Sequence, residues 1–168
     1  MARLKQAGLT LLELAVAMSL MGVVGLSFAY LYVNSQRYLT QSVLASAAQG
    51  EASYAMEHIK RQLLDAVDVT WPAERDTVAR PQLNFRIRRT MADPAVGVPA
   101  VYSMAGTTLQ YSIDGGPATP IASNLSVMTF KRNSRVQLGV DITARQRTAG
   151  GDARETSLHA DVGVRGIF

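Results

Sequence analysis

The hydrophobic pattern divides the chain into four segments. Residues 1–8 are short, polar and basic, and residues 9–33 are almost entirely apolar, with Glu13 as their one charged residue. Residues 34–70 are polar with a helical rhythm, and residues 71–168 carry prolines, glycines and alternating patterns. An apolar run of about 18 residues or more is typical of a membrane-spanning helix. The sequence therefore argues against a plain soluble domain.

The third segment has one apolar face at helical spacing. Its apolar residues recur every three or four positions, as in an amphipathic helix; they are Leu44, Ala48, Ala52, Met56, Ile59, Leu63 and Val67 or Ala66. No proline or paired glycine interrupts the chain from Leu9 to Val69. We therefore expect one continuous helix through residue 70, and we expect its apolar face to pack on the C-terminal part of the chain. Trp71-Pro72 would end it, because the residue before a proline is pushed out of helical space.

After this helix the apolar period changes to two, which predicts strands. The alternating residues are Leu83, Phe85 and Ile87; Leu109, Tyr111 and Ile113; Leu125 and Val127 with Met128 or Phe130; Val136, Leu138, Val140 and Ile142; and Leu158, Ala160, Val162 and Val164. Asp114-Gly115-Gly116 and Gly150-Gly151 predict turns, and residues 90–100 predict a surface loop. Strands at short spacing without helices between them favour an antiparallel sheet. The predicted fold class is α+β, with a long N-terminal helix packed on a C-terminal antiparallel β-sheet.

Composition narrows the chemistry. The chain has 168 residues and no cysteine, which excludes disulfides, Cys-ligated zinc and thiol nucleophiles. The sequence motifs of serine hydrolases, P-loop proteins and zinc proteases are absent. Asp114 is the single carboxylate of its glycine turn, too few oxygen ligands for calcium. We therefore expect no enzyme activity, no cofactor and no metal site.

The positive charge is weak evidence about partners. The net charge is +4, and Arg3 and Lys5 supply two of the positive charges ahead of the apolar run. Two clusters could bind nucleic acid or a partner protein, one predicted on a strand and one on a loop; they are Arg86, Arg88 and Arg89, and Lys131, Arg132 and Arg135. No aromatic residues interleave these charges as in single-strand binders, so a solvated sheet surface is the favoured interpretation and nucleic acid stays open. For His58 and His159 we expect surface or helix-face positions.

The N-terminal segment fits an anchor better than a cleaved signal peptide. Signal peptides have a shorter apolar stretch followed closely by a small-x-small cleavage site. Here Ala45-Ser46-Ala47 has suitable residues, but it lies well past the apolar run and inside the predicted helix. Arg3 and Lys5 predict a cytoplasmic N-terminus, a single pass through the inner membrane, and the remainder of the chain outside.

A simple anchor does not explain Glu13. A carboxylate within an apolar membrane segment costs free energy, and such charges usually have a partner. No cationic side chain lies within a helical turn of it. Cleavage after Gly8 would create an α-amine at Leu9, and in a neighbouring subunit displaced along the helix that amine could meet Glu13. The pair would then set the register of an assembly.

The run from Gly8 to Leu14 closely resembles the processing site of type IV prepilins and type II secretion pseudopilins. That family has a short basic leader ending in glycine, an aromatic or apolar residue, threonine, two apolar residues and glutamate, followed by a long apolar helix. The resemblance implies a leader of residues 1–8, cleavage between Gly8 and Leu9 by the prepilin peptidase, and N-methylation of Leu9. It also implies assembly through Thr10 and Glu13. Leu9 departs from the family's usual phenylalanine or methionine.

Small residues follow the apolar helix at Ala15, Ser19, Gly22, Gly25 and Ala29. Small side chains let helices approach closely in lipid or in a filament core, so these positions are candidates for helix packing. The alternative is the ordinary tolerance of membrane helices for small residues. The implied partners are the peptidase and methyltransferase, other major and minor pilins or pseudopilins, the inner-membrane assembly platform, and lipid before assembly.

Features within the family favour a minor subunit. Major pilins commonly have a proline where this chain has Tyr30, and many close a C-terminal loop with a disulfide. Residues 56–63, together with the closing strand through Val162 to Gly166, look like the J-type pseudopilins and W-type minor pilins. We expect a structural subunit of a type IV pilus or of a type II secretion filament that ends in the periplasm or at the cell surface. The sequence leaves the machine open, DNA uptake included. The alternative function is a membrane-anchored β-rich binding domain that never polymerises.

Overall fold

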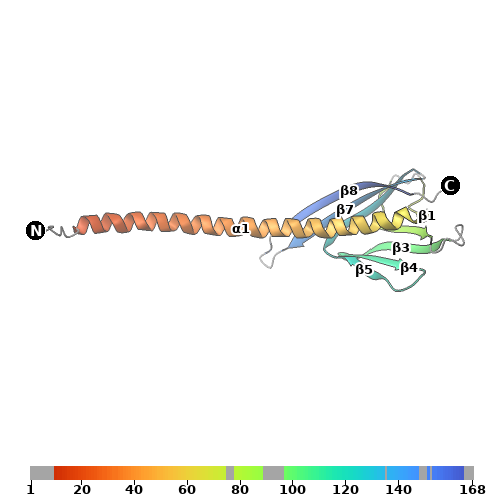
Figure 1. Ribbon diagram of the computed structural model, residues 1–168, viewed down its shortest axis with the longest axis horizontal. Helices are drawn as coiled ribbons and strands as arrows, with labels where there is room; N and C mark the ends of the chain where they lie inside the picture. The colour runs from red at the N-terminus through yellow and green to blue at the C-terminus, as the bar shows by residue number, and fades with distance from the viewer. Residues whose placement is uncertain are drawn as a thin grey trace, which may run out of the picture. The chain divides into compact units, whose positions relative to one another are not determined.

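The computed structural model describes residues 10–74, 78–88, 97–134, 136–147, 151 and 153–164. Within these residues, one long helix, α1 (Leu11–Leu64), precedes eight strands; Figure 1 shows the helix and labels most of the strands. The chain divides into two compact units. The N-terminal unit is Met1–Gln41 and the C-terminal unit is Ser42–Phe168. The α+β fold class, with a long N-terminal helix packed on antiparallel sheet, is confirmed.

The strands form two antiparallel sheets instead of the single sheet expected. The first sheet has the order β1-β2-β3-β4-β5 and the second the order β6-β7-β8. Their bounds are β1 (Ala66–Trp71), β2 (Leu83–Ile87), β3 (Val98–Ala105), β4 (Thr108–Ile113), β5 (Thr119–Ala122), β6 (Leu125–Ser134), β7 (Gln137–Arg147) and β8 (Ala153–Gly163). Within each sheet, consecutive strands are neighbours, so both sheets are meanders.

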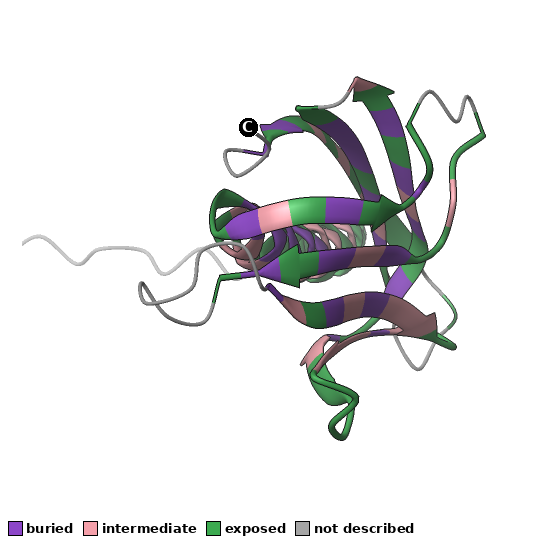
Figure 2. Ribbon diagram, turned by 90° about the vertical axis from the view of Figure 1, so that its right-hand side faces the viewer, coloured by how far each residue is buried: buried purple, intermediate pink, exposed green. Residues whose placement is uncertain are grey.

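The predicted helix face forms the core contact of α1. Its buried residues are Ala48, Ala52, Ala55, Met56, Ile59 and Leu63, and they join one cluster with the inward residues of both sheets. On the strands, buried and exposed residues alternate around the helix (Figure 2). Fully buried Phe85, Tyr102 and Phe130 are the largest side chains that the sheets contribute. The amphipathic pattern was therefore interpreted correctly.

The prediction that the helix continues through residue 70 is wrong. The helix ends at Leu64, and β1 comes next and pairs with β2. Val67, Val69 and Thr70 are β-branched and suit a strand. Register shifts in β1 bring Ala66 and Val69, three residues apart, to the same buried side. A bulge of this kind imitates helical spacing.

Three other strand predictions need correction. Residues 98–100, expected in a surface loop, begin β3, while residues 89–96 lie outside the described residues. Val127 is exposed because β6 shifts register between Leu125 and Val127, so Met128 and Phe130 carry the buried side onward. Val136 is also exposed and precedes β7. The predicted turn at Asp114-Gly115 is confirmed, with positive φ at both residues (57° and 67°).

The inner edges of the two sheets are joined. Arg80 and Phe130 form an antiparallel bridge, with backbone N···O distances of 2.9 and 2.7 Å. Arg132 of β6 is 8% exposed and donates a hydrogen bond from Nη1 to the carbonyl oxygen of Val69 in β1, at 2.6 Å. This buried cation therefore links β6 to β1.

Candidate processing and assembly site

The first turn of α1 is closed by Thr10 and Glu13. The Glu13 Oε2 atom accepts hydrogen bonds from the backbone N–H of Thr10 (2.9 Å) and from its hydroxyl (3.0 Å). In return, the hydroxyl oxygen of Thr10 accepts a hydrogen bond from the backbone N–H of Glu13 (3.3 Å). This reciprocal arrangement is a capping box, which satisfies two backbone donors that a helix N-terminus otherwise leaves unpaired.

The capping box gives Glu13 partners within its own chain that our sequence reasoning missed. The sequence has no cationic side chain within a helical turn of Glu13. The spacing Thr-x-x-Glu at a helix start, however, predicts this hydrogen-bonded pair directly. The positive end of the helix dipole also favours a carboxylate in the first turn. Among the residues that the structure describes, the negative charge of Glu13 nevertheless meets no cationic side chain. A cationic partner for Glu13 would therefore have to come from another chain.

The predicted cleavage pair, Gly8 and Leu9, lies outside the described residues. Cleavage there and methylation of Leu9 stay predictions. In sequence, Leu9 directly precedes Thr10, the residue that caps the helix.

The N-terminal unit exposes apolar side chains along α1. Leu12, Leu20 and Phe28 are 76%, 62% and 69% exposed. The helix contains a stretch long and apolar enough to cross a membrane, with a mean hydropathy of 2.0 and none of that stretch buried. Because apolar surface of this extent is unfavourable in water, the segment requires lipid or other helices around it.

The small residues lie on one face of this helix, away from Glu13. At about 100° per residue, Ala15, Ser19, Gly22, Gly25 and Ala29 fall within an arc of about 120°, while Glu13 lies about 160° from Ala15. A Cβ atom added at Gly22 or Gly25 would meet nothing within 4 Å. The chain's own packing therefore does not require glycine there.

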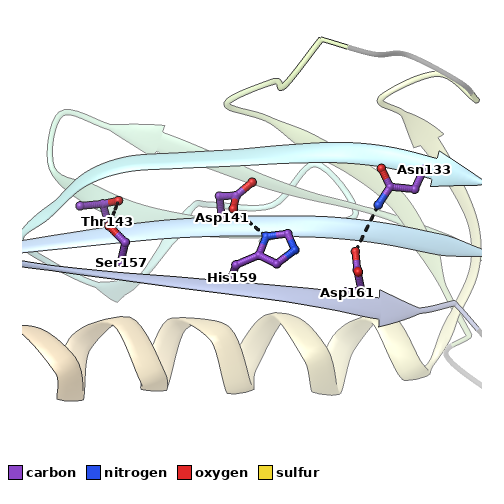
Figure 3. A network of polar contacts seen from close by, with 6 residues as sticks. All are labelled: Asn133, Asp141, Thr143, Ser157, His159 and Asp161. Atoms are coloured by element: carbon purple, nitrogen blue, oxygen red, sulfur yellow. Dashed lines mark hydrogen bonds and ion pairs between the residues drawn. The ribbon is translucent and has the colours of Figure 1, made fainter.

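His159, for which we expected a surface or helix-face position, lies exposed on β8. His159 Nδ1 lies 2.7 Å from Asp141 Oδ1, but the Ser157 hydroxyl pairs with Thr143 (2.9 Å) and not with the imidazole (Figure 3). Asp141, Ser157 and His159 are exposed on β7 and β8, and Thr143 is half-buried. Among the described residues, no group of three or more His, Cys, Asp or Glu side chains could hold a metal ion.

The two basic clusters differ from their predicted form. Arg86 and Arg88 are exposed at the end of β2, and Arg89 lies outside the described residues. Lys131 and Arg132 belong to strand β6 and not to a loop, because the strand extends to Ser134; Arg135 is not described. Arg132 is buried and bonded to Val69, so its charge serves packing between strands.

His58 is not a simple surface residue. It is half-buried, and its Nδ1 lies 2.7 Å from the hydroxyl of Tyr102. Its ring meets Tyr102 and Tyr111 edge-on, with centroid distances of 5.9 and 5.6 Å. Burial, assisted by the charge of Arg61, lowers the pKa of His58 below its ordinary value. The residue is therefore a neutral part of the contact between α1 and the first sheet.

Comparison with known proteins supports the N-terminal interpretation. The family description "Prokaryotic N-terminal methylation motif" matches residues 3–29. No curated protein and no solved structure matches the chain. The matched residues contain the predicted cleavage pair, the capping box and the small-residue face. The chain thus carries the N-terminal methylation motif of type IV prepilin-like proteins, which extends into an exposed apolar helix that precedes the C-terminal unit in sequence.

Proposed function

We propose that the chain is a minor pilin or pseudopilin, cleaved after Gly8, methylated at Leu9 and assembled through α1 into a type IV pilus or type II secretion filament. One observation carries the proposal: the methylation motif extends into a helix whose apolar side chains are exposed and whose Glu13 has no cationic partner in the described part of its own chain. Before assembly, lipid covers this surface, with Arg3 and Lys5 on the cytoplasmic side. In the filament, neighbouring helices replace the lipid.

The geometry of the helix supports polymerisation over simple anchoring. Glu13 and the small-residue face point in nearly opposite directions, so each can contact a different neighbour. A helical filament needs two unlike surfaces on every subunit, because heterologous contacts propagate while self-complementary ones close. A plain anchor needs neither surface.

The minor assignment rests on weaker support. The helix runs through Tyr30 without a proline, and the chain has no cysteine for the disulfide common in major pilins. The exposed C-terminal sheets would contact neighbouring subunits. Counting this chain against the other subunits in sheared filaments tests the point, since a minor subunit should be scarce.

Processing is tested by the intact mass and N-terminal sequence of the protein from its native host, with and without the prepilin peptidase. We expect a mature chain that begins at Leu9, is heavier by one methyl group and depends on that peptidase. A chain that keeps Met1, or one cut near Ala47, would contradict the proposal.

Assembly is tested at Glu13. We expect Glu13→Ala and the nearly isosteric Glu13→Gln both to abolish recovery of the chain in sheared filaments while leaving it membrane-bound. Both remove the charge, and only alanine also removes the acceptor for the two hydrogen bonds from Thr10. Thr10→Ala is the matched variant that breaks the capping box and keeps the charge. If Glu13→Ala assembles normally, the chain is an anchored binding domain instead.

A further inference from the structure

The outer edge of β8 is the longest outer sheet edge that the described structure leaves unpaired. Exposed strand edges template pairing with another chain, and proteins usually shorten, bulge, charge or cover them. The inner edge of β6 is bridged at Phe130 by Arg80, which precedes β2. The inner edge of β1 receives the Arg132 side chain at the carbonyl oxygen of Val69. The other outer edge, on β5, has four residues, contains Pro120 and pairs with β4 through a register shift.

Strand β8 is neither short nor bulged, and its charged residues, Arg154, Glu155 and Asp161, are the one such protection that it carries. It has 11 residues, Ala153–Gly163, and pairs with β7 without a register shift. At about 3.3 Å per residue, it offers an edge of roughly 36 Å. It contains no proline and no lysine. Among the described residues, no strand lies beyond it in the sheet.

The direction of the free backbone groups can be derived from one hydrogen bond. The N–H of Val164 donates to the carbonyl oxygen of Val136 at 2.9 Å. Backbone direction alternates along an antiparallel ladder, so even-numbered residues of β8 bond to β7. The odd-numbered residues therefore direct both N–H and C=O outward; they are Glu155, Ser157, His159, Asp161 and Gly163.

Burial across the ladder shows that the inner face of β8 is incompletely covered. Val140 and Ile142 of β7 are fully buried, yet their partners Ala160 and Leu158 on β8 are only half-buried. The side chains face the same core at the same level. The difference is the exposure expected beside a missing neighbour strand.

The outer face of the same strand is acidic and polar. Glu155 pairs with Arg145 at 3.3 Å. Figure 3 shows Asp161, which accepts a hydrogen bond from Asn133 at 3.1 Å. The bond from Asn133 on β6 to Asp161 on β8 passes over Gly139 of β7, which has no side chain to obstruct it. The bond therefore draws an Asp161 oxygen inward over β7, away from the outer edge. The outer-face side chains of β8 bond within their own sheet, which leaves the backbone of the edge for docking.

The geometry points to β8 as a docking edge for an extended segment of a neighbouring filament subunit, which would add a fourth strand to this sheet. Such strand addition takes its affinity from main-chain hydrogen bonds and its specificity from alternate side chains. The segment would place apolar residues beside half-buried Leu158 and Ala160 and polar residues beside exposed Ser157 and His159. That the partner is a filament subunit rests on the proposed function; the edge itself does not.

Amide hydrogen exchange on the full chain tests the inference. The two samples are sheared filaments from the native host and membranes from a Glu13→Ala strain, in which assembly is expected to stop. A strand bound at about 99% occupancy slows exchange of the amides it covers about 100-fold. We expect this slowing at Glu155, Ser157, His159 and Asp161 in filaments only. The even-numbered amides of β8 should exchange at the same rate in both samples.

A matched pair of variants separates backbone from side chain. Ser157→Pro removes one outward N–H while the ladder to β7 stays intact, and Ser157→Ala removes the same hydroxyl but keeps the N–H. We expect only the proline variant to lose the slow exchange at its neighbours. Unchanged protection of the even-numbered amides confirms that it folds.

The outcomes distinguish a failure of the docking edge from a failure of the proposed function. If the chain is present in filaments and its odd-numbered β8 amides exchange as fast as in membranes, the docking edge is wrong and the proposed function stands. If the chain is absent from filaments but those amides are slow in wild-type membranes, the edge is used and the proposed function is wrong. Absence together with fast exchange overturns both.

Discussion

Replacing Tyr102 by phenylalanine removes one hydroxyl from the contact between α1 and the first sheet. Tyr102 is fully buried, and its ring stacks on Phe85 at a centroid distance of 5.6 Å, which phenylalanine would preserve. The hydroxyl lies 2.7 Å from His58 Nδ1 and 3.4 Å from the carbonyl oxygen of His58. Burial raises the pKa of Tyr102, so the hydroxyl keeps its proton.

These contacts set the expected magnitude. A hydrogen bond of this kind contributes about 0.5–1.5 kcal/mol to the free energy of unfolding. Because half-buried His58 can exchange its lost partner for water, we expect Tyr102→Phe to cost about 1 kcal/mol. His58→Ala should cost more, about 2–3 kcal/mol, because it also removes the edge-on ring contacts and leaves a buried hydroxyl with only its longer bond.

Urea unfolding of the full chain in detergent micelles measures both values. Trp71 is the single tryptophan and lies on β1, so its fluorescence reports on the C-terminal unit. With a typical slope of about 2 kcal/mol per molar urea, 1 kcal/mol moves the midpoint by about 0.5 M. The double variant should show a coupling of about 1 kcal/mol. A coupling of zero, or a Tyr102→Phe variant as stable as wild type, would refute the hydrogen bond as a source of stability.

Two further predictions use the same assay. Burial lowers the pKa of His58 below 6.5, so the unfolded state takes up the proton first as pH falls. The free energy of unfolding should therefore decrease from about pH 6.5 downward until the folded-state pKa is passed. His58→Gln should flatten this part of the pH profile. Arg132→Met should cost about 1–3 kcal/mol, because it leaves the buried carbonyl of Val69 without its 2.6 Å donor, whereas Lys131→Met on the exposed side should change stability by less than about 0.5 kcal/mol. Equal effects at Arg132 and Lys131 would contradict the buried link between strands, and an unchanged pH profile in His58→Gln would contradict the proton linkage.

The sequence predicted those elements in which side-chain period and burial coincide. The face of α1 from Ala48 to Leu63 and the strands β2 and β7 keep a clean period, so the pattern identified both the element and its buried side. Register shifts in β1 and β6 break the period, because a bulge turns the strand by one residue. Those shifts arise from how neighbouring strands pair, and the pattern of a single sequence does not contain the strand pairing.

Two of the strands were difficult to predict because they contain proline. Pro99 lies in β3 and Pro120 in β5, and a proline usually argues against a strand because it cannot donate to a ladder. Pro120 lies on an edge strand, where a missing donor is tolerated. Pro99 lies on an internal strand opposite Arg86, and its carbonyl oxygen still accepts a hydrogen bond from the N–H of Asp114 at 2.7 Å. Whether a strand tolerates a proline depends on its place in the strand order, which the sequence does not reveal. The composition of residues 90–100 therefore predicted a loop.

The candidate assembly surfaces also differ in whether the sequence alone predicts them. Glu13 and the small-residue face are visible in sequence because they lie on one helix, where position fixes direction; even the capping box can be predicted from the spacing of Thr10 and Glu13. The β8 edge becomes visible only when strand order leaves it outermost. A subunit inside a filament needs two unlike helix surfaces to propagate, and α1 supplies both. An added edge for strand docking is not required for propagation, so β8 would give this chain a partner that an otherwise similar subunit could lack.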